Sequence, residues 1–220
     1  MTDVRQDFDS SIFQILDNNS ILDFNENNLF NRVNFHFQDA YSALHYRFIK
    51  GIFTFDPGVT FHYYKTTTDQ LNLITSDAYS FIRPDFRVLM KLKESETLRL
   101  IFRSTRQFTD INNLAEGFIF RNYNSFFRGN SNLEAAFFNV VNLNYQSINI
   151  FNFTNIFANL SYSRRDNAIQ NTTAVQGINS VRSATNSDFP RYTYTASGRI
   201  DKRFKNFKGG LNVNFNYSDF

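Results

Sequence analysis

The sequence predicts an all-β fold, namely an antiparallel up-and-down transmembrane β-barrel to which this chain contributes about eight strands of a larger barrel. Three observations support this prediction: apolar and polar residues alternate with a period of two, Phe and Asn dominate the composition, and short and long connections alternate along the chain. A wide barrel requires such strands, because its outer face meets lipid and its lumen holds water.

The composition excludes several classes of protein. Phe (28) and Tyr (11) are abundant, whereas Gly (8) and Pro (3) are scarce, and the mean hydropathy is −0.40. The net charge of +3 is too small for a concentrated basic patch, so no nucleic-acid partner is expected. The absence of Cys excludes disulfides and thiolate metal ligands. The longest apolar run, residues 135–138, is too short for a transmembrane helix.

The first 39 residues differ from the rest of the chain. Residues 1–39 are acidic and rich in Asn, and we expect a polar loop or the end of a preceding strand there, whereas residues 40–220 form part of the barrel. Val33, Phe35 and Phe37 extend the first strand through an expected bulge within 38–43. Because the N-terminus does not resemble a signal peptide, we expect an exported chain to be a fragment.

Period-two alternation places the strands. It is clearest in Leu211–Tyr217, where apolar residues at odd positions are separated by Asn. Asp56-Pro57-Gly58 resembles a turn, but the apolar residues on both sides share one parity, which predicts a single strand with an irregularity. The expected strands lie near 40–49, 52–64, 81–92, 97–106, 135–147, 154–165, 190–204 and 209–220.

Connections of alternating length favour a membrane barrel over a soluble sheet. Short connections are expected near residues 50–51, 93–96, 147–153 and 205–208. Long polar stretches separate these hairpins, at 65–80, 107–134 and 166–189. Transmembrane barrels have short periplasmic turns and longer extracellular loops. The alternative is a soluble antiparallel sheet with one face in water.

Part of the sequence resembles a known family. The resemblance is carried by Phe81-Ile82-Arg83-Pro84, by the hairpin Val88–Phe102 with Leu98–Ser104, by Arg128-Gly129-Asn130-Ser131-Asn132-Leu133-Glu134 and by Asn142–Tyr145. Together with Phe53–Tyr64, these segments resemble the C-terminal barrel of TonB-dependent receptors of the Bacteroidetes type, over roughly residues 40–220.

The chain departs from the family pattern at several places. Ser131 stands where the family commonly has Pro, and Val59-Thr60 stands where it favours Leu-Arg. No plug domain and no TonB-interacting segment is visible, and family barrels have more strands. Phe220 does not share the parity of Val213, Phe215 and Tyr217, so we expect the natural chain to continue beyond it.

The resemblance implies a receptor in the cell outer membrane that imports a bulky nutrient. Its partners would be outer-membrane lipid, the TonB system acting through a plug domain absent from this chain, and a small-molecule, glycan or peptide ligand. Two alternatives remain open. One is a structural or adhesive outer-membrane barrel without transport, and the other is a soluble β-rich binding module.

The long stretch 107–134 holds the candidate ligand-binding residues. Arg121, Tyr123, Phe126 and Arg128, with Phe127 beside them, combine guanidinium forks that bind carboxylates with aromatic faces that stack on ligands. The alternative is a solvated loop whose aromatic side chains pack on neighbouring loops.

No residue pattern predicts catalysis, a metal site or a cofactor. Glu94 and Glu96 lie in an exposed turn, and Ser104 has no nearby His, so we expect no enzyme. His36, His45 and His62 are far apart in sequence and lack the spacing of metal ligands. We expect all three to face the lumen and to be solvated.

Overall fold

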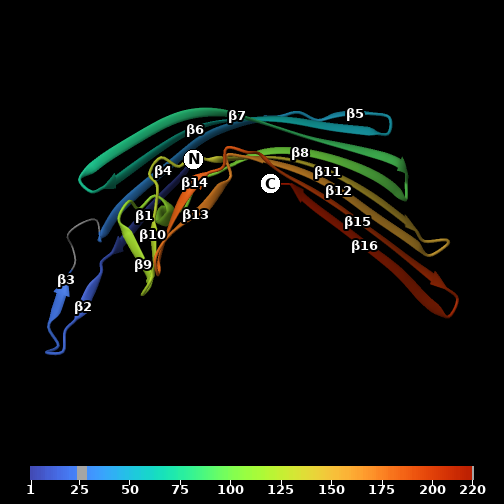
Figure 1. Cartoon of the computed structure of the whole chain (residues 1–220). Helices are drawn as coiled ribbons and strands as arrows, with labels where there is room; N and C mark the ends of the chain where they lie inside the picture. Colours follow the sequence, from blue (N-terminus) through green and yellow to red (C-terminus); the bar gives the residue numbers. More distant parts are fainter. Residues whose placement is uncertain (24–28, 220) are drawn as a thin grey trace.

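The computed structural model describes residues 1–23 and 29–219, and the prediction about Phe220 lies outside these residues. The main element is a ten-stranded sheet that curves into an arch (Figure 1). Its neighbouring strands are antiparallel. Nine of them follow in the order β1 (Thr2–Ser10), β4 (Asn31–His45), β6 (Phe53–Gln70), β7 (Leu73–Lys93), β8 (Glu96–Gln107), β11 (Ala136–Asn149), β12 (Thr154–Asp166), β15 (Arg191–Phe204) and β16 (Phe207–Asp219), and the tenth, β5 (Phe48–Lys50), pairs with β6.

The sheet does not close on itself, as the partial-barrel prediction requires. Within the described residues β1 and β16 form its two edges and do not pair with each other. All eight predicted strands are present, and β1 adds a further strand. The described residues include no helix of the length and apolarity needed to cross a membrane.

The expected range 1–39 contains several strands. It holds β1, the short hairpin β2 (Phe13–Ile15) and β3 (Ile21–Asp23), and the first part of β4. The predicted bulge within 38–43 is wrong, because β4 pairs with β6 without a register shift from Val33 to His45. Val33, Phe35 and Phe37 therefore face the concave side.

The Asp56-Pro57-Gly58 segment lies inside the single strand β6, as predicted. The irregularity appears in the partner strand, which is interrupted between β4 and β5 (Phe48–Lys50). Tyr46 donates its N–H to the Pro57 carbonyl, but Pro57 has no N–H to return. Gly58 leaves room for the His45 imidazole, which a Cβ at this position would overlap.

The prediction of a long loop at 65–80 is wrong. β6 and β7 continue through this range and are joined by Leu71-Asn72, both with positive φ (51° and 61°), as in the primed turns of hairpins. Residues 166–189 are also not a loop. They contain the hairpin β13 (Ile169–Gln176) and β14 (Asn179–Asn186).

The convex face of the sheet is apolar along the middle of β8, β11, β12, β15 and β16. One register row crosses five strands as Leu100, Leu143, Leu160, Ala196 and Phe215. Leu160 is 53% exposed although its strand is paired on both sides, so no described residue covers it. A parallel row runs through Phe86, Phe102, Val141, Tyr162, Tyr194 and Tyr217, and its aromatic residues resemble the girdles of transmembrane barrels.

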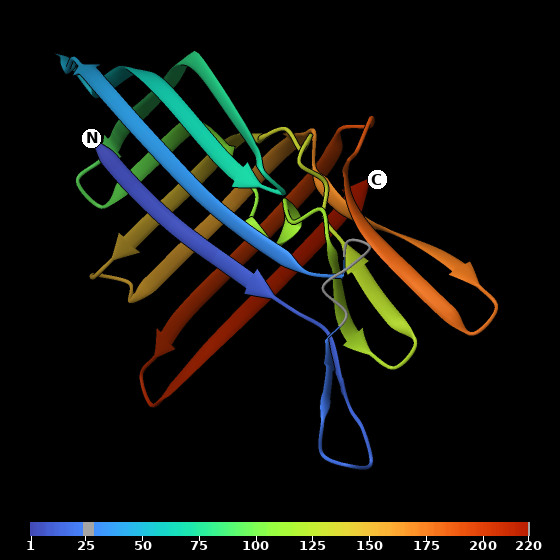
Figure 2. The same ribbon diagram turned by 90° about the vertical axis from the view of Figure 1, so that its left-hand side faces the viewer.

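A second, four-stranded sheet lies under the arch, near the end of the long β6–β7 hairpin (Figure 1). Viewed from the side, the hairpins β9–β10, β13–β14 and β2–β3 extend beyond the main sheet (Figure 2). β9 (Phe118–Asn122) and β10 (Ser125–Arg128) belong to the β8–β11 connection, whereas β13 and β14 belong to the β12–β15 connection. Strand β10 pairs in parallel with β14, so the two connections share one sheet.

Candidate functional site

The β8–β11 connection, residues 108–135, folds against the concave face of the main sheet, and we call it the cap segment. Its 3-10 helix η1 (Ile111–Asn113) begins after Asp110, whose side chain accepts a hydrogen bond from the Asn112 N–H. Ile111 and Ala115 are buried against Val33 of β4. The cap segment therefore covers Val33, which accounts for an apolar residue on the concave side of β4.

Two buried amide side chains fasten the cap segment to the strands. Asn31 Oδ1 accepts from the Gly117 N–H at 2.8 Å, and Asn31 Nδ2 donates to Ser10 Oγ at 2.9 Å. Gln70 Nε2 donates to the Leu114 carbonyl at 3.2 Å. A Cβ on Gly117 would overlap the Phe30 carbonyl oxygen, so this close approach requires glycine.

A cavity of about 860 Å³ lies between the cap segment and strands β6 and β7. We call it the vestibule cavity. Its volume is in the range of small-molecule sites. Its walls combine aromatic, hydroxyl and charged side chains, including Phe35, Thr68, Asp77, Tyr79, Arg106 and Phe137.

Arg106 lines the vestibule cavity, and its guanidinium lies over two aromatic rings. Its guanidinium carbon lies 4.3 Å from the ring centre of Phe81 and 4.2 Å from that of Phe137. Such stacking restricts the planar guanidinium. Its Nε is buried and has no hydrogen-bond partner. The sequence analysis did not single out Arg106, because it lies near the end of a strand, β8, without any distinctive local pattern.

An aromatic cluster forms the wall beside Arg106. The Phe108 ring of the cap segment lies 4.7 Å from Phe37, 5.0 Å from Tyr64 and 6.2 Å from Tyr79, measured between ring centres. Burial raises the pKa of the Tyr79 phenol to about 12 and also raises that of Tyr64. The Tyr79 phenol therefore stays neutral to a higher pH than a free phenol.

The four predicted ligand-binding residues lie on the β9–β10 hairpin but do not converge. Phe126 and Arg128 lie on one face, where Phe126 contacts Phe120 and the Arg128 guanidinium carbon lies 5.8 Å from the Phe118 ring centre. Arg121 lies on the other face, 5.4 Å from Phe127. Tyr123 is in the turn between the strands and is 80% exposed. Their role in binding stays a prediction.

Two of the three His residues, His62 and His36, differ from the expectation of solvated lumen residues, whereas His45 lies on the concave side with its side chain 55% exposed, as expected. His62 is only 5% exposed, and its Nδ1 lies 3.0 Å from Asp39 Oδ1. Its ring stacks on Tyr64. His45 contacts Asp85, whereas His36 lies on the convex side next to Asp3. His62 is buried because neighbouring rings and Asp39 surround it.

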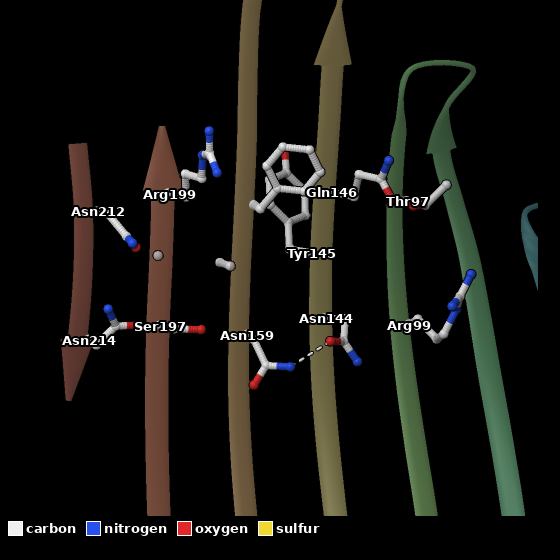
Figure 3. Close-up of a pocket in the computed structure, with 13 residues that line it drawn as sticks. Thr97, Arg99, Asn144, Tyr145, Gln146, Asn159, Ser197, Arg199, Asn212 and Asn214 are labelled. Carbon is white, nitrogen blue, oxygen red and sulfur yellow. Dashed lines mark hydrogen bonds between the residues drawn. The ribbon is translucent and has the colours of Figure 1, made fainter. Parts of the chain in front are cut away.

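A second cavity, of about 350 Å³, lies on the concave face of β8, β11, β12, β15 and β16. We call it the polar groove. One register row supplies Arg99, Asn144, Asn159, Ser197 and Asn214 in succession. Figure 3 shows these side chains on neighbouring strands, with Asn159 donating to Asn144. Amide, hydroxyl and guanidinium donors thus dominate this surface.

No protein-family model and no curated protein matches the chain. Its structure is similar to that of copper transporter OprC, with a TM-score of 0.68 and 11% identity over 98% of this chain and 34% of that protein. The siderophore receptor PirA from Pseudomonas aeruginosa has a TM-score of 0.56 at 11% identity, over 86% of this chain and 44% of PirA. The FrpB iron transporter from Neisseria meningitidis has a TM-score of 0.54 at 12% identity, over 86% of this chain and 26% of FrpB.

These similarities show the fold. The chain has the fold of part of the barrel wall of TonB-dependent outer-membrane receptors. It spans about a third of the length of OprC.

Proposed function

We propose that this chain forms part of the barrel of an outer-membrane receptor that imports a bulky nutrient, with energy supplied by the TonB system. The observation that carries the proposal is the contrast between the two faces of one sheet. The convex face carries Leu160 and its apolar register row, whereas the concave face carries the polar groove and the vestibule cavity. Such a wall separates lipid from a water-filled lumen.

The cap segment favours a receptor over a purely structural or adhesive barrel. It folds inward and helps to enclose a cavity of about 860 Å³, whereas an adhesive barrel has no need of an inward-facing cavity. The names of similar structures, which include a copper transporter, an iron transporter and a siderophore receptor, suggest that metal ions or their chelates are the first ligands to test. The Bacteroidetes type of receptor and coupling through a plug domain remain predictions from the sequence.

The test compares three strains of the native host: wild type, a strain lacking this gene, and a strain lacking TonB. The compounds and metals that each strain removes from a complex medium are compared by mass spectrometry. We expect the two deletion strains to fail to remove the same compound or metal, while the protein is found in the outer-membrane fraction. Identical removal by the gene-deletion strain and wild type would refute import. Removal that is lost without the gene but preserved without TonB would refute energised uptake.

A further inference from the structure

The concave faces of β7 and β8 carry a line of basic side chains. Arg83, Arg87 and Lys91 recur every four residues along β7 and so share one face, which is the concave one because Arg83 lies opposite buried Thr60. In the β7–β8 register Arg103 lies opposite Asp85, and Arg99 lies opposite Leu89. We call Arg83, Lys91, Arg99 and Arg103 the basic stripe.

The basic stripe is not neutralised by the described residues. Asp56 accepts hydrogen bonds from both Arg87 and Arg47, and Asp85 lies 3.4 Å from His45. Within residues 1–23 and 29–219, no carboxylate forms an ion pair with a member of the stripe. Among these residues, therefore, no ion pair balances the positive charge of the stripe.

The stripe joins the two cavities of the concave face. Its upper member, Arg83, lies on β7 four residues beyond Tyr79, which lines the vestibule cavity. Arg99 lines the polar groove, where Asn144 and Asn159 lie beside it in one register row. Guanidinium and amide donors thus extend from one cavity to the other.

We propose that the basic stripe binds a small-molecule ligand bearing several anionic oxygens, as carboxylates or phosphates, on its way from the vestibule cavity to the polar groove. Three of the four members are Arg, whose planar fork of donors fits such groups in a bidentate manner. The inference rests on the proposed receptor function, because it takes the concave face as the lumen of a barrel. An acidic protein segment filling the lumen is the competing occupant, and the test below distinguishes it.

The experiment uses the local electrostatic potential as its readout. This chain has no Cys, so Thr97→Cys in the intact protein places one thiol of the chain in the polar groove, next to Arg99. The rates of its modification by anionic and by cationic methanethiosulfonate reagents are measured in outer membranes, with the modified peptide identified by mass spectrometry. Asn214→Cys is the matched control, since Asn214 lines the same groove on β16, far from β7.

We expect the ratio of anionic to cationic rates to be higher at Thr97→Cys than at Asn214→Cys. Adding Arg99→Gln and Arg103→Gln should lower this rate ratio about five-fold at Thr97→Cys, as expected for screened charges at this range. The ratio at Asn214→Cys should change little. Citrate should slow modification at Thr97→Cys only while both Arg residues are present, and glucose should have no effect.

Three outcomes would overturn the proposal. The first is an equal rate ratio at Thr97→Cys and Asn214→Cys, and the second is a lack of protection by citrate. The third is a thiol at Thr97→Cys that reacts with neither reagent, which would mean that a protein segment covers the stripe. None of these readouts depends on transport. A protein with the expected ratios that imports nothing would therefore refute the proposed function and leave the anion site standing.

Discussion

Replacing Asn31 with Ala should release the cap segment from the main sheet. Asn31 is 4% exposed and makes hydrogen bonds to Gly117, Ser10 and Phe118. The substitution removes these bonds and leaves the buried Gly117 N–H without a partner. Lost bonds and one unsatisfied donor together cost about 2–4 kcal/mol. At about 1.4 kcal/mol per factor of ten, local opening should become roughly 30- to 1,000-fold more frequent.

Amide hydrogen exchange, followed by mass spectrometry, measures this opening directly. Peptides from residues 110–130 should lose protection in Asn31→Ala, while peptides from β11 and β12 stay protected. Asn34→Ala is the control, because Asn34 is exposed on the same strand. Gly117→Ala should reproduce the effect, since its Cβ would overlap the Phe30 carbonyl oxygen. Unchanged exchange in the cap segment, or an equal rise in β11 and β12, would refute the reasoning.

Three further predictions concern single side chains. Arg106→Gln should lower the free energy of unfolding by about 1–2 kcal/mol through the loss of stacking on two rings, measured by thermal unfolding, with Arg121→Gln as a milder control. Leu160→Arg should reduce assembly into membranes by about 2–4 kcal/mol if its face meets lipid, whereas Asn159→Arg on the other face should change it little; equal effects would contradict the assignment of the faces. Because burial raises the pKa of Tyr79 to about 12 from its ordinary value of 10, its stabilising contribution is complete below pH 10 and declines as the pH rises toward 12. Tyr79→Phe should therefore flatten the alkaline part of the stability curve, and an unchanged curve would contradict this.

The strands could be predicted wherever one face of the sheet is apolar and the other polar. Along Leu211–Tyr217 the apolar residues keep one parity, because a shift of one residue would turn every side chain to the other face. The same rule fails toward the end of the β6–β7 hairpin. Thr66, Thr67 and Thr68 belong to β6, yet they show no alternation, because both faces of the extended hairpin can be polar.

The inward-folded cap segment could not be predicted from local patterns. Val33, Phe35 and Phe37 have the alternation of a lipid-facing strand, but it is Ile111 and Ala115, far away in the sequence, that cover them. The four predicted site residues lie on or between β9 and β10, and their role in binding stays a prediction. The two faces of that hairpin separate Arg121 from Arg128, which depends on a strand pairing that loop composition does not reveal.

The parallel pairing of β10 with β14 has a mechanical consequence. It joins two connections that leave the main sheet at different strands, and Asn130 Nδ2 donates to the Ala184 carbonyl at 3.3 Å beside it. Neither connection can swing outward alone without breaking these bonds. Displacing one connection therefore requires either moving the other with it or first breaking the pairing between them.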